Sequence, residues 1–385
     1  MWSRQPMYHT YDYGRALYSK PFRVYTHPYK TKYTDVNAVK THNYDDLSEQ
    51  LKIRMENLLQ GHYISLQNCT FMINKTVLDT YFTGNKHGTV ISFQSCSLPS
   101  MGKTTIYEYA QQLQAANNDP IGTCLSRSIQ IILAGQMKKD AYYVEYICSN
   151  RLRSDLHSNR TLIDTHLFSQ HYREPNIEIS IIRSKGETFP GIVPLVEYDT
   201  YNYRMHNLNI QPLPNGYEIV GIQKDNENII TDFFEHIENL ENTNPLFDMI
   251  LNPTIYKYCD LVKSKQCFIY GLRRADTLYA VYVFKHTHIY NEEYDGYVLQ
   301  CICSIMNFRS APIFYNGFLH AIREVLHVNP GFKVLSIDGI AHNEIIHAHW
   351  GQSNELLDSH KNALYSYNYV VPGTPFNCKR VLCML

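Results

Sequence analysis

The sequence lacks the features that mark secreted, membrane and zinc-binding proteins. Its ten cysteines form no CxxC pair and follow no regular spacing, which excludes a zinc ribbon and favours reduced thiols in a core. The first 20 residues hold no apolar leader, and no run approaches the roughly 18 apolar residues that a membrane-spanning helix needs. We therefore expect a soluble, cytoplasmic protein with no transmembrane segment.

An excess of charge of one sign is also absent. The formal net charge is -1 and the sequence pI is about 7.0, so no global field draws the chain to nucleic acid or to anionic membrane. We expect no nucleic-acid partner. With 385 residues, 44% of them hydrophobic and 18% charged, the chain is long enough for two or three average domains and a large core.

Several common catalytic motifs are missing or incomplete. There is no GxSxG nucleophile elbow, and no cysteine stands out as a nucleophile. The histidine-rich stretch 342–349 lacks the HExxH spacing, so we expect no metal site. Residues 97–104 resemble a P-loop, but Ser97 stands where the first glycine belongs, and a side chain there removes backbone room that the loop needs. A surface insertion over 94–120 is favoured.

Hydrophobic periodicity divides the chain into an N-terminal arm and two halves of similar order. The arm covers 1–44, the first half 45–206 and the second half 207–385, with a linker rich in proline, asparagine and glycine at 207–216. In the first half we expect helices at 45–59, 105–116 and 160–172 and strands at 88–93, 127–133, 142–148 and 177–182. In the second we expect helices at 229–240 and 312–327 and strands at 266–272, 278–285, 297–306, 333–337 and 364–369. This recurrence predicts an α+β protein with an internal structural duplication.

A basic turn between a strand and a helix is the best anion site in the sequence. Residues 151–160 hold three arginines, two serines and an asparagine. Exposed N–H groups at the start of a helix, flanked by guanidinium groups, suit a pyrophosphate. An ordinary solvated turn is the alternative, and the absence of glycine from the turn leaves both readings open.

The end of the chain is apolar. Residues 381–385 read Val-Leu-Cys-Met-Leu, without the polar tail on which many chains end. We expect this segment to be docked inside the fold as a last strand of the second half. The terminal carboxylate of Leu385 would then be available as a general base.

Four motifs together resemble the N-myristoyltransferase family. They are Leu152-Arg153-Ser154 after a strand, Gly186 followed by Phe189-Pro190 and Tyr198, the run 331–334, and the run 365–372 with the apolar end at 381–385. The resemblance covers about residues 45–385, and its specificity lies in the order and spacing of the motifs. It implies two fused acetyltransferase-like halves related by a pseudo-twofold, with a mixed central sheet flanked by helices.

The resemblance also implies roles for individual residues. Backbone amides at Glu145 and Tyr146 would form the oxyanion hole, and Leu385 would supply the base. The coenzyme A site would comprise Arg151, Leu152, Arg153, Ser154, Asp155, His157, Ser158 and Asn159. The substrate peptide would contact Phe71, Ser184, Gly186, Tyr198 and Asn368.

The function implied is transfer of a myristoyl or other long-chain acyl group from coenzyme A to an N-terminal glycine amine. Attack would be direct, with no covalent enzyme intermediate. Myristoyl-CoA would be a co-substrate, with no tightly bound cofactor, and proteins beginning in glycine would be the acceptors of a monomeric enzyme. The divergence and the abundance of Tyr, Asn, Ile and Lys lead us to expect a viral source.

Two alternatives stay open. One is a related enzyme with a different acyl donor or acceptor, and the other is an inactive binding or structural homologue. Asp155, Leu156 and His157 reduce the positive charge expected at the pyrophosphate, and only Phe71 remains of the expected peptide-groove aromatics. Glu145 would have to point outward, because an inward carboxylate would oppose the developing anion.

Overall fold

The computed structural model describes residues 5–17, 20–64, 66, 68–95, 120–135, 137–150, 156–205, 208–223, 226–238, 245–253 and 255–385. The P-loop-like stretch 97–104, the expected helix 105–116 and the basic residues 151–155 lie outside these ranges. Within the described residues, no helix is long and apolar enough to cross a membrane.

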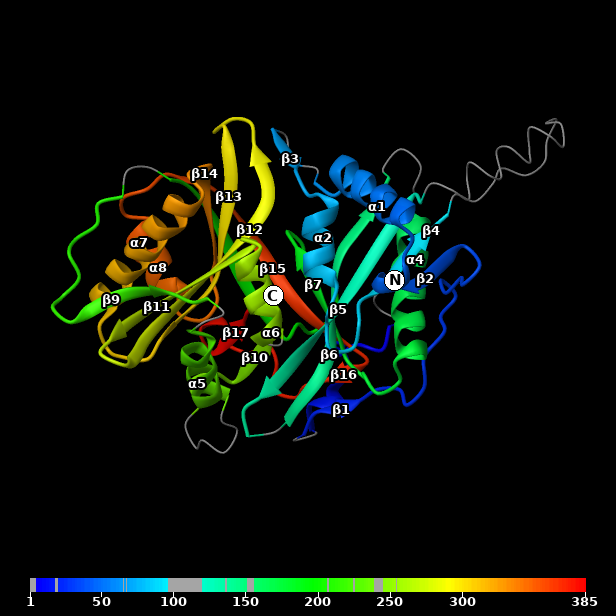
Figure 1. The fold of residues 1–385 in the computed structure, drawn as a ribbon. Helices are drawn as coiled ribbons and strands as arrows, with labels where there is room; N and C mark the ends of the chain where they lie inside the picture. Colours follow the sequence, from blue (N-terminus) through cyan, green and yellow to red (C-terminus); the bar gives the residue numbers. More distant parts are fainter. Residues whose placement is uncertain are drawn as a thin grey trace.

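One large mixed sheet organises the molecule, and helices flank it (Figure 1). Fifteen strands belong to it, with twelve in the order β17-β10-β5-β6-β7-β15-β8-β14-β13-β12-β11-β9. The arm contributes β2 (Val39–Asn43), and the first-half strands are β3 (Cys69–Phe71), β4 (Val90–Gln94), β5 (Gly122–Leu133), β6 (Met137–Ser149), β7 (Ser180–Lys185) and β8 (Val196–Arg204). The second-half strands are β9 (Tyr217–Gly221), β10 (Met249–Asn252), β11 (Cys267–Arg274), β12 (Thr277–Asn291), β13 (Gly296–Met306), β14 (Phe332–Asp338), β15 (Leu356–Tyr367) and β17 (Val381–Cys383).

Helices of both halves flank the sheet, and α6 of the second half contacts α2 of the first. They are α1 (Glu49–His62), α2 (Lys75–Phe82), α4 (Leu156–Arg173), α5 (Glu227–Glu238), α6 (Ile255–Lys263), α7 (Ala311–Val328) and α8 (Asn343–Trp350). Helix α1 begins later than expected, at Glu49, because the Ser48 hydroxyl accepts a hydrogen bond from the Leu51 N–H and caps the helix. The histidine-rich stretch lies on α8, and the described residues contain no group of side chains arranged to hold a metal ion.

The two halves repeat one arrangement, as the sequence predicts. In the first, β4, β5 and β6 pair antiparallel in turn, and β7 follows α4 and pairs parallel with β6. In the second, β11, β12 and β13 pair antiparallel, and β14 follows α7 and pairs parallel with β13. The expected fold class, α+β with a mixed sheet flanked by helices, is confirmed.

The halves also exchange a short strand, which the sequence does not predict. Strand β3, between α1 and α2, pairs with β12 of the second half. Strand β10, between α5 and α6, pairs with β5 of the first half. Each half therefore contributes a strand to the other.

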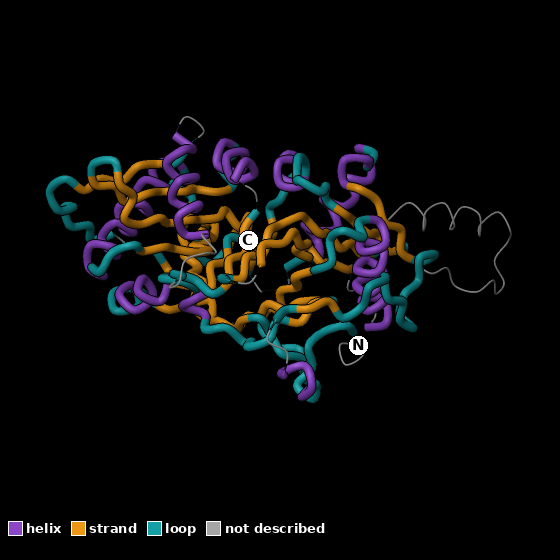
Figure 2. The backbone as a smooth tube through the Cα atoms, turned by 90° about the horizontal axis from the view of Figure 1, so that it is seen from below, coloured by secondary structure: helices purple, strands orange, loops and turns teal. Residues whose placement is uncertain are grey.

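The last strands lie where the two halves meet, a position that the sequence patterns do not specify. Strand β15 pairs with β7 on one side and with β8 on the other, and β17 runs parallel to β10 beside β5. Both views place the end of the chain between the two halves (Figures 1 and 2).

The N-terminal arm packs on α4 and contributes to both sheets. Asp164 of α4 accepts hydrogen bonds from Gln5 Nε2 at 2.6 Å and from the Thr31 hydroxyl at 2.8 Å. Residues Phe22–Arg23 form β1, which pairs with β16 (Tyr369–Val370) in a separate two-stranded sheet. Strand β2 pairs with β4 at the edge of the main sheet, so the last part of the arm belongs to the core structure.

Candidate functional site

Strands β6 and β7 run side by side for only three residue pairs before they part. The pairs are Tyr142 with Ser180, Tyr143 with Ile181 and Val144 with Ile182. Strand β6 continues to Ser149 and β7 to Lys185 without further pairing between them. A parallel pair that opens in the middle of a sheet leaves backbone N–H and C=O groups without their ladder partners, and such groups are available to a ligand.

A β-bulge lies where the strands part. On the β5 side, Leu125 pairs with Glu145 and Thr123 with Cys148, so Tyr146 and Ile147 together face Cys124. Tyr146 has a φ of 49°, in the left-handed region that non-glycine residues rarely adopt. The Tyr142 N–H donates to the Ile179 carbonyl at 2.9 Å, whereas β7 makes no further pair with β6 beyond Val144.

Aromatic rings hold Tyr146 in this conformation. Ring centroids of neighbouring residues lie 5.2 to 6.2 Å from that of Tyr146, and they belong to Tyr63, Phe71, Tyr81 and Phe82. Contacts of this kind add stability beyond the area they bury. The predicted peptide residue Phe71 is therefore brought next to the predicted oxyanion residue Tyr146.

For the predicted site, strand alternation would require the Glu145 side chain to point outward into solvent. The structure instead places this side chain in the interior. It is 8% exposed, and Arg127 Nε of β5 donates to its Oε1 at 2.7 Å. The bulge explains the difference, because it lets Glu145 and Tyr146 both contact Tyr81 of α2. The carboxylate is neutralised by Arg127 and not by water.

Leu385 is docked, as the sequence predicts, with its side chain 8% exposed. The Met384 N–H donates to the Leu251 carbonyl at 2.9 Å, which extends the pairing of β17 with β10. The Tyr258 hydroxyl of α6 donates to the Met384 carbonyl. Leu385 shares an apolar cluster with Tyr143, two residues before Glu145, and with the predicted peptide residue Tyr198.

Polar groups on β7, β8 and β14 surround Tyr198. The Arg183 guanidinium lies 5.6 Å from the centre of the Tyr198 ring, and its Nη2 is 3.5 Å from Asp338 Oδ1. Burial raises the pKa of Tyr198 well above its usual range, so the phenol is neutral, although Arg183 opposes the shift. Burial also raises the pKa of the Cys383 thiol of β17 to about 12, against the charge of Arg183, which lowers it.

Two further predicted peptide residues lie at the end of β7 and in the turn that follows it. The Ser184 hydroxyl donates to the Glu187 carbonyl. Gly186 has a φ of 85°, and its N–H donates to the Lys361 carbonyl at 2.7 Å. A Cβ at Gly186 would meet no atom within 4 Å, so the backbone angle and not crowding requires glycine there.

Asn368 lies apart from the other predicted residues. Its neighbour Tyr367 pairs with Ser180 at the start of β7, whereas the strands part beyond Ile182. The Asn368 Oδ1 accepts from the Tyr25 N–H at 2.9 Å, and its Nδ2 donates to the Tyr25 carbonyl at 3.2 Å. The structure therefore uses this side chain to tie the arm to the sheet.

Most of the predicted coenzyme A residues lie outside the described residues, namely Arg151, Leu152, Arg153, Ser154, Asp155 and the side chain of His157. Ser158 and Asn159 are described, and both lie in the first turns of α4. Asn159 Oδ1 is buried and has no hydrogen-bond partner within the described part of the chain. A buried amide oxygen of this kind calls for a donor.

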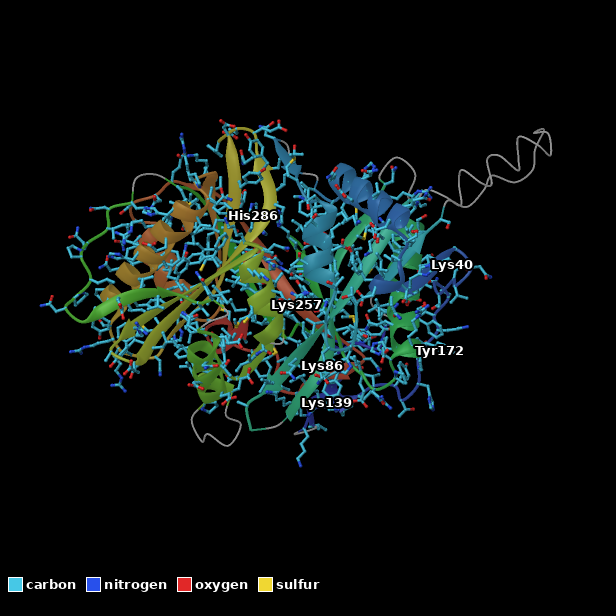
Figure 3. All side chains as sticks on the ribbon, in the orientation of Figure 1. Lys40, Lys86, Lys139, Tyr172, Lys257 and His286 are labelled. Atoms are coloured by element: carbon cyan, nitrogen blue, oxygen red, sulfur yellow. The ribbon has the colours of Figure 1, made fainter. Side chains whose placement is uncertain are left out.

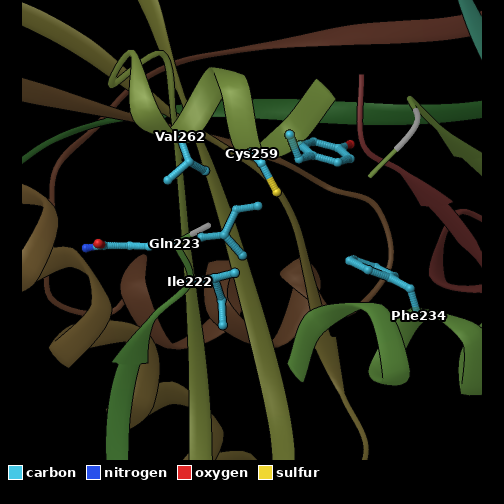
Figure 4. Close-up of a pocket in the computed structure, with 7 residues that line it drawn as sticks. Ile222, Gln223, Phe234, Cys259 and Val262 are labelled. Carbon is cyan, nitrogen blue, oxygen red and sulfur yellow. The ribbon is translucent and has the colours of Figure 1, made fainter. Parts of the chain in front are cut away.

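A small apolar pocket that the sequence does not predict lies in the second half (Figure 4). It is lined by Ile222, Gln223, Phe234, Tyr258, Cys259, Val262 and Ile269. Tyr258 connects it to the end of the chain, through its hydrogen bond to Met384. Neither the spacing nor the residue types of these segments distinguish them from ordinary core, so no sequence signal could have identified the pocket.

Comparisons with known proteins identify the fold. No model of a protein family matches the sequence, and no curated protein does. Among solved structures, Saccharomyces cerevisiae N-myristoyltransferase with bound myristoyl-CoA is similar, with a TM-score of 0.67 and 10% identity over 98% of this chain and 96% of that one. The same enzyme with bound myristoyl-CoA and inhibitors gives a TM-score of 0.68 and 10% identity over 98% and 92%.

The likeness extends over nearly the whole of both chains, which confirms at the level of fold the resemblance that the sequence motifs indicate. The parted strands, the bulge and the docked chain end are thus features of a molecule with the N-myristoyltransferase fold.

Proposed function

We propose that this protein is an acyltransferase that moves a long-chain acyl group, myristoyl in the first instance, from coenzyme A to the N-terminal glycine amine of a protein. The observation that carries the proposal is the parting of β6 and β7 at the Tyr146 bulge. It occurs in a chain whose structural neighbours were crystallised with myristoyl-CoA.

In the proposed reaction, the thioester carbonyl lies at the opening between β6 and β7. Backbone N–H groups at Glu145 and Tyr146 donate to the oxygen as it gains negative charge in the tetrahedral intermediate. The amine nitrogen forms a bond to the carbonyl carbon, and the bond between that carbon and the coenzyme A sulfur breaks. The Arg127 guanidinium offsets the charge of the Glu145 carboxylate, which would otherwise oppose the oxyanion.

The carboxylate of Leu385, the last residue of the printed sequence, takes the proton that the attacking ammonium must lose. The nitrogen gives up a second proton as the carbon–sulfur bond breaks, and the departing thiolate takes up one proton, so the products are an amide and coenzyme A. Leu385 is suited to this role because it packs with Tyr143 of β6 and Tyr198 of β8, close to the strands that part. The peptide would approach along Phe71 and Tyr198.

The test is release of coenzyme A from myristoyl-CoA in the presence of a peptide that begins with glycine. Removal of Leu385, or addition of one residue after it, displaces the carboxylate and is expected to lower kcat by about a hundredfold or more, the usual contribution of a positioned base. Leu385→Ala is the matched control, because it keeps the carboxylate in place and is expected to retain activity within about threefold. Full activity in the shortened and extended variants would show that another group is the base.

A shorter acyl donor is the second candidate function, and the aromatic packing around Tyr146 favours it. Rings of Tyr63, Phe71, Tyr81 and Phe82 occupy the space beside the bulge. Thermal-shift measurements with acyl-CoA of 2 to 16 carbons, a range chosen to cover short and long donors, separate the candidates by ligand-linked stabilisation. A larger shift of the melting temperature with acetyl-CoA than with myristoyl-CoA would overturn the myristoyl assignment. An unchanged melting temperature with every acyl-CoA would favour the inactive binding or structural homologue.

The remaining expectations from the sequence stay proposals. They concern a monomeric state, acceptor proteins that begin with glycine, a cytoplasmic location and a viral source. Size-exclusion chromatography with light scattering tests the first, and mass spectrometry of peptides after incubation with the acyl donor tests the second.

A further inference from the structure

A chain of polar side chains crosses from the first half of the molecule to the second beside the bulge. Arg127 Nε donates to Glu145 Oε1 at 2.7 Å. The Tyr81 hydroxyl donates to Glu145 Oε2 at 3.4 Å, and Lys285 Nζ donates to the Tyr81 hydroxyl at 2.7 Å. We call these four residues the polar chain. It connects β5, β6 and α2 to β12.

The polar chain is buried in a way that disfavours a purely structural role. The Arg127 and Glu145 side chains are 2% and 8% exposed, and desolvation of a buried ion pair can exceed the attraction between its members. The guanidinium lies 4.9 Å from the Tyr81 ring centre and 5.6 Å from that of Tyr143. Its Nη1 is buried and finds no hydrogen-bond acceptor among the described residues. Two apolar side chains of similar size would fill this space at a lower cost in folding free energy than the ion pair.

The charges of the polar chain do not balance. Arg127 and Lys285 carry two positive charges when both are protonated, and Glu145 carries one negative charge, which leaves a net charge of +1. Arg127 and Glu145 alone would form a neutral pair. The excess charge is therefore that of Lys285, whose ammonium lies 4.8 Å from the centre of the Tyr81 ring. Tyr81 in turn packs against Tyr146, the bulge residue.

We propose that Lys285 is a positioning residue of the acyl-transfer site, whose ammonium makes the polar chain net positive and so stabilises the oxyanion that develops at the bulge. The inference rests on the proposed function, because it needs a reaction in which negative charge develops there. Lys285 acts through Tyr81 and touches no reacting atom. Lys285 belongs to β12, so a residue of the second half would contribute to catalysis at a site on the first half.

The charge of Lys285 depends on pH in the range where such reactions are measured. Burial lowers the pKa of Lys285 to about 8, against the charge of Glu145, which raises it. The titratable and charged groups that face it from the packed elements are Tyr81 of α2, Arg127 of β5, Glu145 and Tyr146 of β6, Arg183 of β7 and Cys267 of β11.

Lys285 is the group in this set that titrates near pH 8. Burial raises the pKa of the Cys267 thiol to about 12 and the pKa values of Tyr81 and Tyr146 well above 10. Burial works against the charge of Arg127, but Tyr81 and Glu145 outweigh it and raise the pKa of that guanidinium. The net charge of the polar chain therefore falls from +1 to 0 as the pH rises through about 8.

The experiment compares the full-length wild type with Lys285→Met and Lys285→Arg in coenzyme A release from pH 6.5 to 10. At pH 7, Lys285→Met is expected to lower kcat about tenfold, the effect of one unit charge acting over roughly 10 Å at an effective dielectric constant near 20. The KM for myristoyl-CoA is expected to stay within about twofold. Lys285→Arg keeps its charge at high pH, so its kcat relative to the wild type is expected to rise about tenfold between pH 7 and pH 10.

Lys257 of α6 provides a matched control (Figure 3). Burial lowers its pKa to about 8 as well, but its ammonium donates to the backbone carbonyls of Thr80 and Thr83 at 2.6 and 2.5 Å and not to the polar chain. Lys257→Met removes a buried lysine and is expected to change kcat less than threefold, with the pH profile of the wild type.

The outcomes separate the two proposals. If no acyl-CoA is turned over by the wild type, the proposed function fails and the role of Lys285 fails with it. If the wild type is active and Lys285→Met keeps its kcat and pH profile, only the role of Lys285 is overturned. If Lys285→Met does not fold, the comparison of Lys285→Arg with the wild type decides: a constant ratio between pH 7 and pH 10 overturns the role, and a rising ratio supports it.

Discussion

Tyr146 shows how packing around one residue can determine backbone geometry. Its positive φ is a conformation that costs a non-glycine residue roughly 1 kcal/mol or more. Four aromatic rings surround its side chain, and a buried aromatic residue gains several kcal/mol relative to a truncated one. The packing therefore outweighs the backbone strain, and the bulge is retained.

The ion pair of Arg127 with Glu145 gives a stability prediction at the same scale. Arg127→Met leaves the Glu145 carboxylate buried and uncompensated, so we expect the free energy of unfolding to fall by about 3 kcal/mol or more. Replacing both residues, in Arg127→Met with Glu145→Leu, removes the uncompensated charge and is expected to recover most of that loss. Urea denaturation of the three proteins measures both effects.

A single variant as stable as the wild type would mean that water or a rearranged lysine compensates the carboxylate. A double variant no more stable than the single one would mean that packing, and not charge, is what Arg127 supplies. Either result would contradict the role of Arg127 as the group that neutralises Glu145.

This pair could have been predicted from the sequence. The hairpin of β5 and β6 pairs Leu133 with Met137 and so sets a register in which Arg127 lies opposite Tyr143, with Glu145 as its diagonal neighbour on the same face. Asn368 could not have been assigned in the same way. Its role depends on Tyr25, which is 343 residues away and is brought near by the arm.

At the scale of the element, buried histidines fix α4 to the sheet. His166 lies between the hydroxyls of Ser92 on β4 and Ser126 on β5, at 2.8 and 2.6 Å from its two ring nitrogens. Burial lowers its pKa to about 3. His171, one turn later, has its pKa lowered to about 4 by burial and contacts the Ile177 carbonyl and Ser180.

These histidines predict loss of stability in acid. Their folded pKa values lie below the value near 6.5 of an unfolded histidine, so the unfolded state binds more protons as the pH falls from about 6.5 towards 4. The free energy of unfolding is expected to fall by about 1.4 kcal/mol per pH unit for each such histidine. His166→Gln is expected to reduce this slope by the contribution of one histidine, as measured by denaturation at pH 7, 6 and 5.

His327, exposed near the end of α7, is the control. His327→Gln removes a side chain that contacts water in both states and is expected to leave the slope unchanged. A slope that is the same in His166→Gln and in the wild type would show that His166 is protonated in the folded protein.

The elements that were predicted best are those with long apolar patterns. Strand β13 and helix α7 lie within one residue of the expected ranges, and strands β5 and β6 end within one residue of the expected position but begin five residues earlier. Burial on one or both faces leaves a clear period in these elements. Strand β10 has only four residues, all buried, and strand β3 has three. Runs this short cannot be told from buried loop by pattern, since only their partners in the other half make them strands.

At the scale of the whole molecule, the sequence predicts a repeated α+β order and the structure adds how the repeats join. Strands β15 and β8 pair with each other at the centre, and each also completes the sheet of one half. Sequence patterns describe local order, whereas the place of β15 beside β7 depends on contacts between residues about 180 apart. For that reason the sequence could not show that β15 lies between β7 and β8.

The strand exchange means that neither half is a separable domain. Strand β3 pairs with β12, strand β10 pairs with β5, and β15 lies between β7 and β8. A half produced alone would therefore lack strands that its sheet needs and would expose unpaired edges to aggregation. We expect fragments 1–210 and 211–385 to be insoluble when produced separately and to form a soluble complex when produced together. Two fragments that are each soluble and folded, by circular dichroism, would contradict this expectation.

We therefore expect the two halves to stay associated after a single cut of the chain in the stretch 208–216, because the exchanged strands β3 and β10 hold them together. The exchanged strands would also hold Lys285 at a fixed distance from the bulge. Substrates would then have to fit a rigid boundary between the two halves.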